Sequence, residues 1–87
     1  MIEINRDDFS QEFHDMRLRV MNSRPCPIVF WASGKPESWI YGTLYASREN
    51  DMPNVTFGDL TISVSPREFM ILVDIAANPD SEYAWQW

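Results

Sequence analysis

The sequence predicts one small α+β domain spanning residues 1–87, with elements in the order α-β-β-β-α and room for a short fourth strand. Two observations place helices near the two ends of the chain: apolar residues recur there at helical spacing, and capping residues precede them. A third observation places the strands between the helices, where β-branched and aromatic residues gather around turn sequences. A chain of 87 residues, 45% of them hydrophobic, buries one modest core. We therefore expect an antiparallel sheet packed by the two helices.

Residues 5–23 are expected to form the first helix. Asn5 is placed to cap it, and Asp7 and Asp8 suit the positive end of the helix dipole. Leu18 lies opposite the apolar stripe and is expected to be exposed. The sequence RPCP ends the helix, because proline cannot continue it. The stripe itself consists of four residues at helical spacing: Phe9, Phe13, Met16 and Val20.

A β-hairpin is expected next, with strands at 27–33 and 38–47 joined by the turn sequence GKPE. Side chains alternate between the two faces of a strand, so aliphatic and aromatic residues separate here. Ile40 and Leu44 share the face that we expect to be core. The opposite face is expected to be an exposed surface that binds a partner; packing of its rings under a helix or the C-terminal tail is the alternative. The rings on this second face are Trp39, Tyr41 and Tyr45.

The segment RENDMPN, residues 48–54, is predicted to be a polar loop. Residues 55–64 then form either one strand with a bulge at Gly58 or a tight hairpin that turns at Gly58 and Asp59. Leu60, Ile62 and Val64 alternate with polar residues, which indicates a half-buried strand in either case.

The second helix has the clearest local signal in the chain. Ser65 is the expected N-cap, Pro66 the first helical residue, and Glu68 the partner that completes a capping box. The helix is expected to end before Asn78 and Pro79. It is apolar on nearly every side, so we expect other elements to cover it on more than one face.

Residues 80–87 form an aromatic C-terminal tail in which Tyr83, Trp85 and Trp87 alternate with smaller or polar residues. Three large rings are costly to leave in water, so the tail is expected to dock. Its own domain is one docking surface, and a partner or a second copy of the chain is the other.

Few residues in this chain are suited to catalysis or metal binding. Cys26 and His14 are the only cysteine and histidine, and a Cys–His nucleophile pair would need them to meet beside an orienting group. We expect instead a packed thiol and a solvated imidazole. Structural zinc needs four such ligands, and the three glycines do not form a phosphate-binding loop. The sequence therefore predicts no enzyme, no cofactor and no metal.

Charge and compartment narrow the class of partner. The net charge is −6, and residues 48–87 hold seven acids against two bases. Such a balance opposes direct nucleic-acid binding and favours a protein partner with a basic surface. A single cysteine, an acidic start unlike a secretory signal and the lack of a long apolar run predict a cytoplasmic protein without a membrane partner.

The order α-β-β-β-α is similar to that of the double-stranded-RNA-binding domain. That family contacts RNA with lysines at the start of its second helix, where this chain has Arg67 and Glu68 in an acidic segment. The profile of a short, acidic chain that is rich in Trp and Tyr resembles that of small phage- or plasmid-encoded inhibitors. These include anti-CRISPR and anti-restriction proteins, and immunity proteins fit the profile equally well. The resemblance implies an inhibitor that blocks a basic surface of a target.

Partner binding is expected from rings on the hairpin, acids of the second half and rings of the tail. The alternative is a homo-oligomeric assembly module that uses the second helix and the tail. A stable dimer in solution would indicate the module, and a monomer the inhibitor. The residues expected to bind the partner are Trp39, Tyr41, Tyr45, Glu49, Asp51, Asp59, Tyr83, Trp85 and Trp87.

Overall fold

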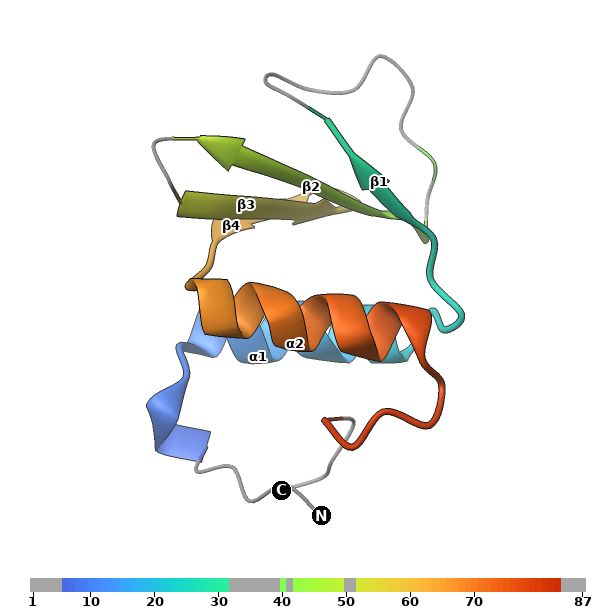
Figure 1. The fold of residues 1–87 in the computed structure, drawn as a ribbon, viewed down its shortest axis with the longest axis horizontal. Helices are drawn as coiled ribbons and strands as arrows, with labels where there is room; N and C mark the ends of the chain where they lie inside the picture. Colours follow the sequence, from blue (N-terminus) through green and yellow to red (C-terminus); the bar gives the residue numbers. More distant parts are fainter. Residues whose placement is uncertain (1–5, 32–39, 41, 50–51, 84–87) are drawn as a thin grey trace.

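The structure, a computed structural model, describes residues 6–31, 40, 42–49 and 52–83. It confirms an α+β domain with two α-helices and a sheet that includes the fourth strand (Figure 1). The elements in chain order are a 3-10 turn η1 (Arg6–Asp8), α1 (Gln11–Met21), β1 (Ile28–Phe30), β2 (Leu44–Glu49), β3 (Met52–Phe57), β4 (Leu60–Ser63) and α2 (Pro66–Ala77).

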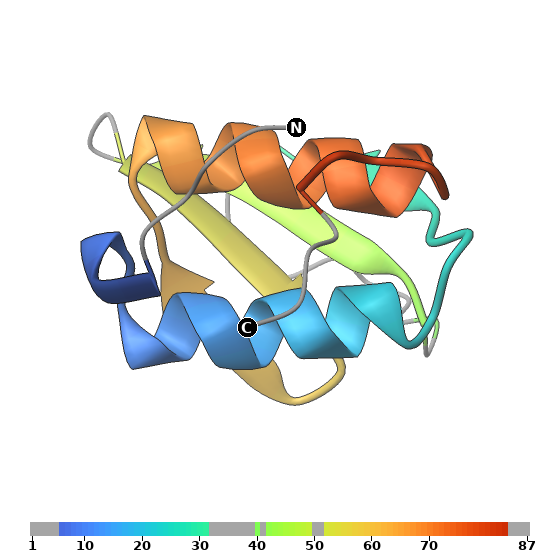
Figure 2. The same ribbon diagram turned by 90° about the horizontal axis from the view of Figure 1, so that it is seen from below.

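Both helices cover the same face of the sheet. Figure 2 shows α1 and α2 side by side and running in the same direction. The first helix contacts β3 and β4, and the second contacts β1, β3 and α1. The second helix is thus covered on more than one side, as its apolar composition predicted. The core between the two layers consists of Phe13, Met16, Val20, Cys26, Leu44, Ala46, Val55, Phe57, Ile62, Val64, Ile71, Leu72, Ile75 and Ala76.

The sheet has the order β1-β2-β3-β4 and is mixed. Strands β2, β3 and β4 pair antiparallel, as predicted, but β1 pairs parallel with β2, with Ile28 opposite Leu44. The hairpin predicted for 27–47 is therefore wrong. A parallel pair needs a long connection, and here β1 already ends at Phe30, so residues 31–43 supply it. Strand propensity identified both strands and carried no information on their relative direction.

The first helix begins later than predicted. Asn5 lies outside the described residues, and the cap is Ser10, whose hydroxyl oxygen accepts a hydrogen bond from the Phe13 backbone N–H at 3.2 Å. Phe13 and its stripe neighbours Met16 and Val20 are fully buried, Phe9 is partly buried, and Leu18 is exposed, as predicted. Asp7 and Asp8, which were expected in the first turn of this helix, lie instead in the short turn η1.

Two predictions for residues 48–64 resolve differently. The loop predicted for 48–54 is wrong, because β2 continues to Glu49 and β3 starts at Met52. Pro53 is tolerated at the end of the β3–β4 ladder, where its carbonyl accepts from the Val64 N–H at 3.0 Å. The hairpin alternative at Gly58 is confirmed: Phe57 pairs with Leu60, and Gly58 has a positive φ of 63°.

The capping box of α2 is confirmed. The Ser65 hydroxyl accepts from the Glu68 N–H at 3.1 Å, and the Ser65 N–H donates to the Glu68 carboxylate at 2.9 Å. The helix ends at Ala77, before Asn78, as predicted.

Candidate functional site

Tyr45 was predicted to be an exposed partner-binding ring, and that exposure is wrong. Its side chain lies on the sheet face away from the helices, but only 3% of the residue is accessible to solvent. The Ile40 backbone N–H donates to its hydroxyl at 2.8 Å, and its ring meets Trp31 edge to face at 5.9 Å. Ile40, predicted to be core, is 63% exposed. Ile40 lies outside β2, which begins at Leu44, so the alternation of the strand does not apply to it.

Of the predicted acids and tail rings, two have described side chains. Asp59 is exposed in the β3–β4 turn, and its carboxylate pairs with Arg19 at 3.2 Å. Tyr83 is half-buried and packs against the core, so at this residue the tail docks on its own domain. Only the backbone of Glu49 is described. The predicted residues that lie outside the described part of the chain are Trp39, Tyr41, Asp51, Trp85 and Trp87.

His14 and Cys26 take part in separate structural contacts. The prediction of a solvated His14 is wrong: the residue is buried, with Nε2 3.0 Å from the carbonyl oxygen of Arg6. Cys26 is buried as predicted, and its thiol donates to the carbonyl of Gly42 at 3.2 Å. Burial raises the pKa of this thiol, with an opposing hydrogen bond to Leu44 as the smaller effect. The buried, protonated thiol is a poor nucleophile.

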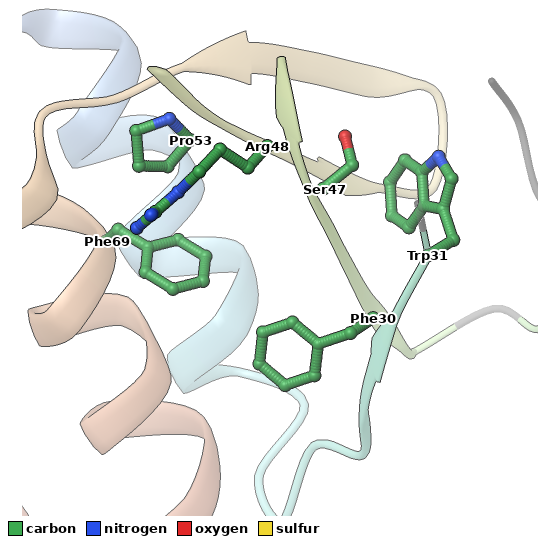
Figure 3. A pocket seen from close by; sticks show the side chains of 6 residues that line it. All are labelled: Phe30, Trp31, Ser47, Arg48, Pro53 and Phe69. Atoms are coloured by element: carbon green, nitrogen blue, oxygen red, sulfur yellow. The ribbon is translucent and has the colours of Figure 1, made fainter. Parts of the chain in front are cut away.

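The described residues contain a cavity of about 260 Å³ between β1, the ends of β2 and β3, and the first turns of α2 (Figure 3). We call it the edge cavity. Its wall is largely apolar and includes Phe30, a residue that is 65% accessible to solvent. The rings of Phe30 from β1 and Phe69 from α2 pack edge to face, with 6.2 Å between their centroids. The lining residues are Phe30, Trp31, Ser47, Arg48, Pro53 and Phe69.

The edge cavity lies beside β2, at the end of β1. Its wall includes side chains from both faces of the sheet. Alternation along β1 and β2 places Phe30 and Arg48 on the helix-facing side and Trp31 and Ser47 on the other. In Figure 3, Arg48 extends past Pro53 toward Phe69, whereas Ser47 points away from them. Residues of both faces line one cavity here because β1 ends at Phe30 whereas β2 continues to Glu49.

The charge of the edge cavity is opposite to that of the chain. Arg48 is exposed and is the one charged side chain in the wall. Within the described part of the chain, no ion pair neutralises it; the recorded ion pair joins Arg19 to Asp59. A carboxylate of a ligand in the cavity would meet the exposed Arg48 guanidinium beside aromatic rings.

Sequence reasoning did not identify this cavity. Its residues come from four separate segments, and each one locally resembles ordinary strand or helix sequence. The early end of β1 at Phe30 creates the opening, and no local residue pattern marks that end.

Fold and site together define a small α+β domain with an aromatic cavity at the edge of its sheet. Comparisons with models of protein families, with curated proteins and with solved structures give no match. In the described residues there is no group of three or more His, Cys, Asp or Glu placed to hold a metal. The described helices are also too short or too polar to span a bilayer.

Proposed function

We propose that this chain is a small acidic protein-binding module that inhibits its target by covering a basic surface. The proposal includes the anti-defence or immunity type encoded by phages or plasmids, with anti-CRISPR proteins as one class, and a cytoplasmic site of action. It involves no catalytic step. The observation that carries it is the edge cavity, whose exposed Phe30 ring stands in a chain of net charge −6.

The size of the cavity favours a protein partner over a small ligand. Sites for small molecules measure roughly 300–1,000 Å³ and enclose most of their ligand. The edge cavity, about 260 Å³, is smaller and borders an exposed ring. Such a cavity suits one inserted side chain, and aromatic rings of this kind are typical of binding hot spots.

The surface charge supports a basic target. Exposed acids lie along η1 and the outer side of α1, and others follow α2. Charges of this kind steer association with an oppositely charged surface, while a buried apolar contact slows dissociation. The exposed acids on η1 and α1 are Asp7, Asp8, Glu12 and Asp15.

The proposal is tested by affinity capture from host lysate followed by mass spectrometry, with three baits. We expect a protein captured by the parent chain and by Leu18→Ser but lost with Phe30→Ser. Leu18 is the matched control, since it is also an exposed apolar residue but lies on α1. No capture, or capture that ignores Phe30, would contradict the proposal.

The second candidate is a homo-oligomeric assembly module. It is favoured by Met70, which is 56% exposed on α2 next to the cavity residue Phe69. Sedimentation analysis at micromolar concentration separates the two functions. A monomer supports the inhibitor, and a dimer that dissociates on Met70→Ser supports the module.

A further inference from the structure

We propose that the edge cavity binds an extended segment of the partner protein. The segment adds a short stretch of strand to the open edge of β2, inserts an aromatic or large aliphatic side chain beside Phe30 and Phe69, and presents an acidic side chain to Arg48. This inference rests on the proposed function, because it identifies what the partner places in the cavity.

The open edge follows from the lengths of β1 and β2. The parallel ladder uses the Leu44 N–H, which donates to Pro27 at 2.9 Å, and the Ala46 carbonyl, which accepts from Trp31 at 3.0 Å. Every second residue of a strand turns its backbone groups to the same neighbour. The next residue of β2 to face this side is Arg48, and β2 continues to Glu49. In the described residues, no strand pairs with this edge beyond Ala46.

An open strand edge is a template for a further strand. Here the apolar wall lies directly beside it, because the cavity is lined from both faces of β2. A segment that pairs with the Arg48 backbone therefore has its helix-facing side chains next to Phe30 and Phe69. An apolar side chain there covers a ring that is otherwise in water.

The acidic residue is placed by alternation as well. The Arg48 side chain and the Phe30 ring are on the same, helix-facing side of the sheet. Side chains two residues apart in a strand share one face, whereas neighbours do not. The segment therefore carries its apolar and acidic residues at i and i+2. An acidic residue in the segment is compatible with a target surface that is basic elsewhere. Arg48 is the one cation of the cavity wall, and the chain as a whole is acidic.

The test uses the full chain and four blocked peptides, followed by backbone amide NMR. An added strand runs in either direction, so acetyl-TFTDT-amide and acetyl-TDTFT-amide are both titrated. For one of them we expect saturable shifts centred on Arg48, Phe30 and Phe69. The control acetyl-TFDTT-amide has the same composition with the acid moved by one residue, and acetyl-TFTNT-amide removes the charge. If acetyl-TDTFT-amide is the better ligand, the corresponding controls are acetyl-TTDFT-amide and acetyl-TNTFT-amide. Each control should bind at least about fivefold more weakly, in line with the strength of charge-assisted hydrogen bonds.

Two protein variants separate the contacts. Arg48→Gln should weaken the acidic peptide to the level of the Asn peptide and leave the Asn peptide unchanged, which is the signature of a direct pair. Phe30→Ser should weaken both peptides equally. Leu18→Ser should change neither.

Equal affinity for the Asp and Asn peptides, shifts centred elsewhere, or no binding at millimolar concentration would overturn the inference. N-acetylphenylalanine, which carries a terminal carboxylate, is titrated as well. Binding of this small molecule without binding of the peptides would also overturn the inference. Failure of the peptides with Phe30-dependent capture from lysate would leave the proposed function standing. Peptide binding without any captured protein would reject the proposed function instead.

Discussion

The backbone N–H of Ile40 donates a hydrogen bond to the hydroxyl of Tyr45 at 2.8 Å. This contact joins two residues whose expected positions are exchanged: Ile40 was predicted to be core and is exposed, and Tyr45 was predicted to be exposed and is buried. The tyrosine lies on the face of β2 that alternation assigned to it. On that face, the Trp31 ring lies against its ring and the Ile40 backbone contacts its hydroxyl, and the residue is buried.

Substitutions at the buried Tyr45 should cost more stability than a substitution at the exposed Ile40. Tyr45→Phe removes the hydroxyl that accepts from the Ile40 N–H and should lower the free energy of unfolding by about 0.5–1.5 kcal/mol. Tyr45→Ala removes the buried ring and should lower it by about 3–5 kcal/mol. Ile40→Ala, at an exposed position, should stay within about 0.5 kcal/mol of the parent. Urea unfolding measures all three, and a cost for Ile40→Ala equal to that for Tyr45→Ala would contradict the placement of both residues.

Leu44 is the core residue of β2 that the sequence identified, and it is fully buried. Leu44→Ala should lower the free energy of unfolding by about 2–5 kcal/mol, because the change leaves a cavity in the core. Leu18→Ala is the control on the exposed side of α1 and should have little effect. Similar costs at the two positions would show that Leu44 is not held in a packed core.

The capping box of α2 predicts a helix-specific loss. Ser65→Ala leaves the Glu68 N–H without its side-chain acceptor and should cost about 1 kcal/mol. Ser65→Asp keeps an acceptor at the cap and should retain most of the stability. Thermal unfolding followed by circular dichroism compares the variants, and equal melting temperatures for Ser65→Ala and the parent would refute the contribution of the cap.

The pH dependence of Cys26 has a definite sign. Its pKa is raised by burial, so the folded state favours the protonated thiol. Stability from this group is fully present below the ordinary thiol pKa of about 8.5 and is lost as pH rises through the higher folded value. We expect iodoacetamide to label Cys26 slowly in the native protein at pH 8 and rapidly in urea. Cys26→Ser should remove the labelling and reduce the fall in stability at alkaline pH; fast labelling without urea would contradict the burial.

Electrostatic steering should appear in the association rate. If acids guide the chain to a basic target, binding to the captured partner should weaken as salt rises, mainly through slower association. Changing Glu49, Asp51 and Asp59 together to amides should have the same effect. The fold should persist, because Asp59 is exposed and its pair with Arg19 is a surface contact. Surface plasmon resonance at several salt concentrations gives the rates, and an affinity that ignores salt would assign the acids to solubility alone.

The elements that depend on local chemistry were predictable from the sequence. The capping box at Ser65, the end of α2 before Asn78 and the apolar stripe of α1 use residues close together in the chain, so their hydrogen bonds and spacing depend on local sequence. Alternation likewise identified Leu44 as core.

Only the tertiary structure decided how the segments meet. The parallel pairing of β1 with β2, the burial of Tyr45 and the continuation of β2 to Glu49 all depend on partners far away in sequence, for which strand propensity carries no signal. The edge cavity depends on the same long-range pairing. It exists because β1 ends at Phe30 while β2 runs on, and because α2 brings Phe69 beside that opening. Composition and local periodicity specified the kinds of elements, and the packing of distant segments created the site.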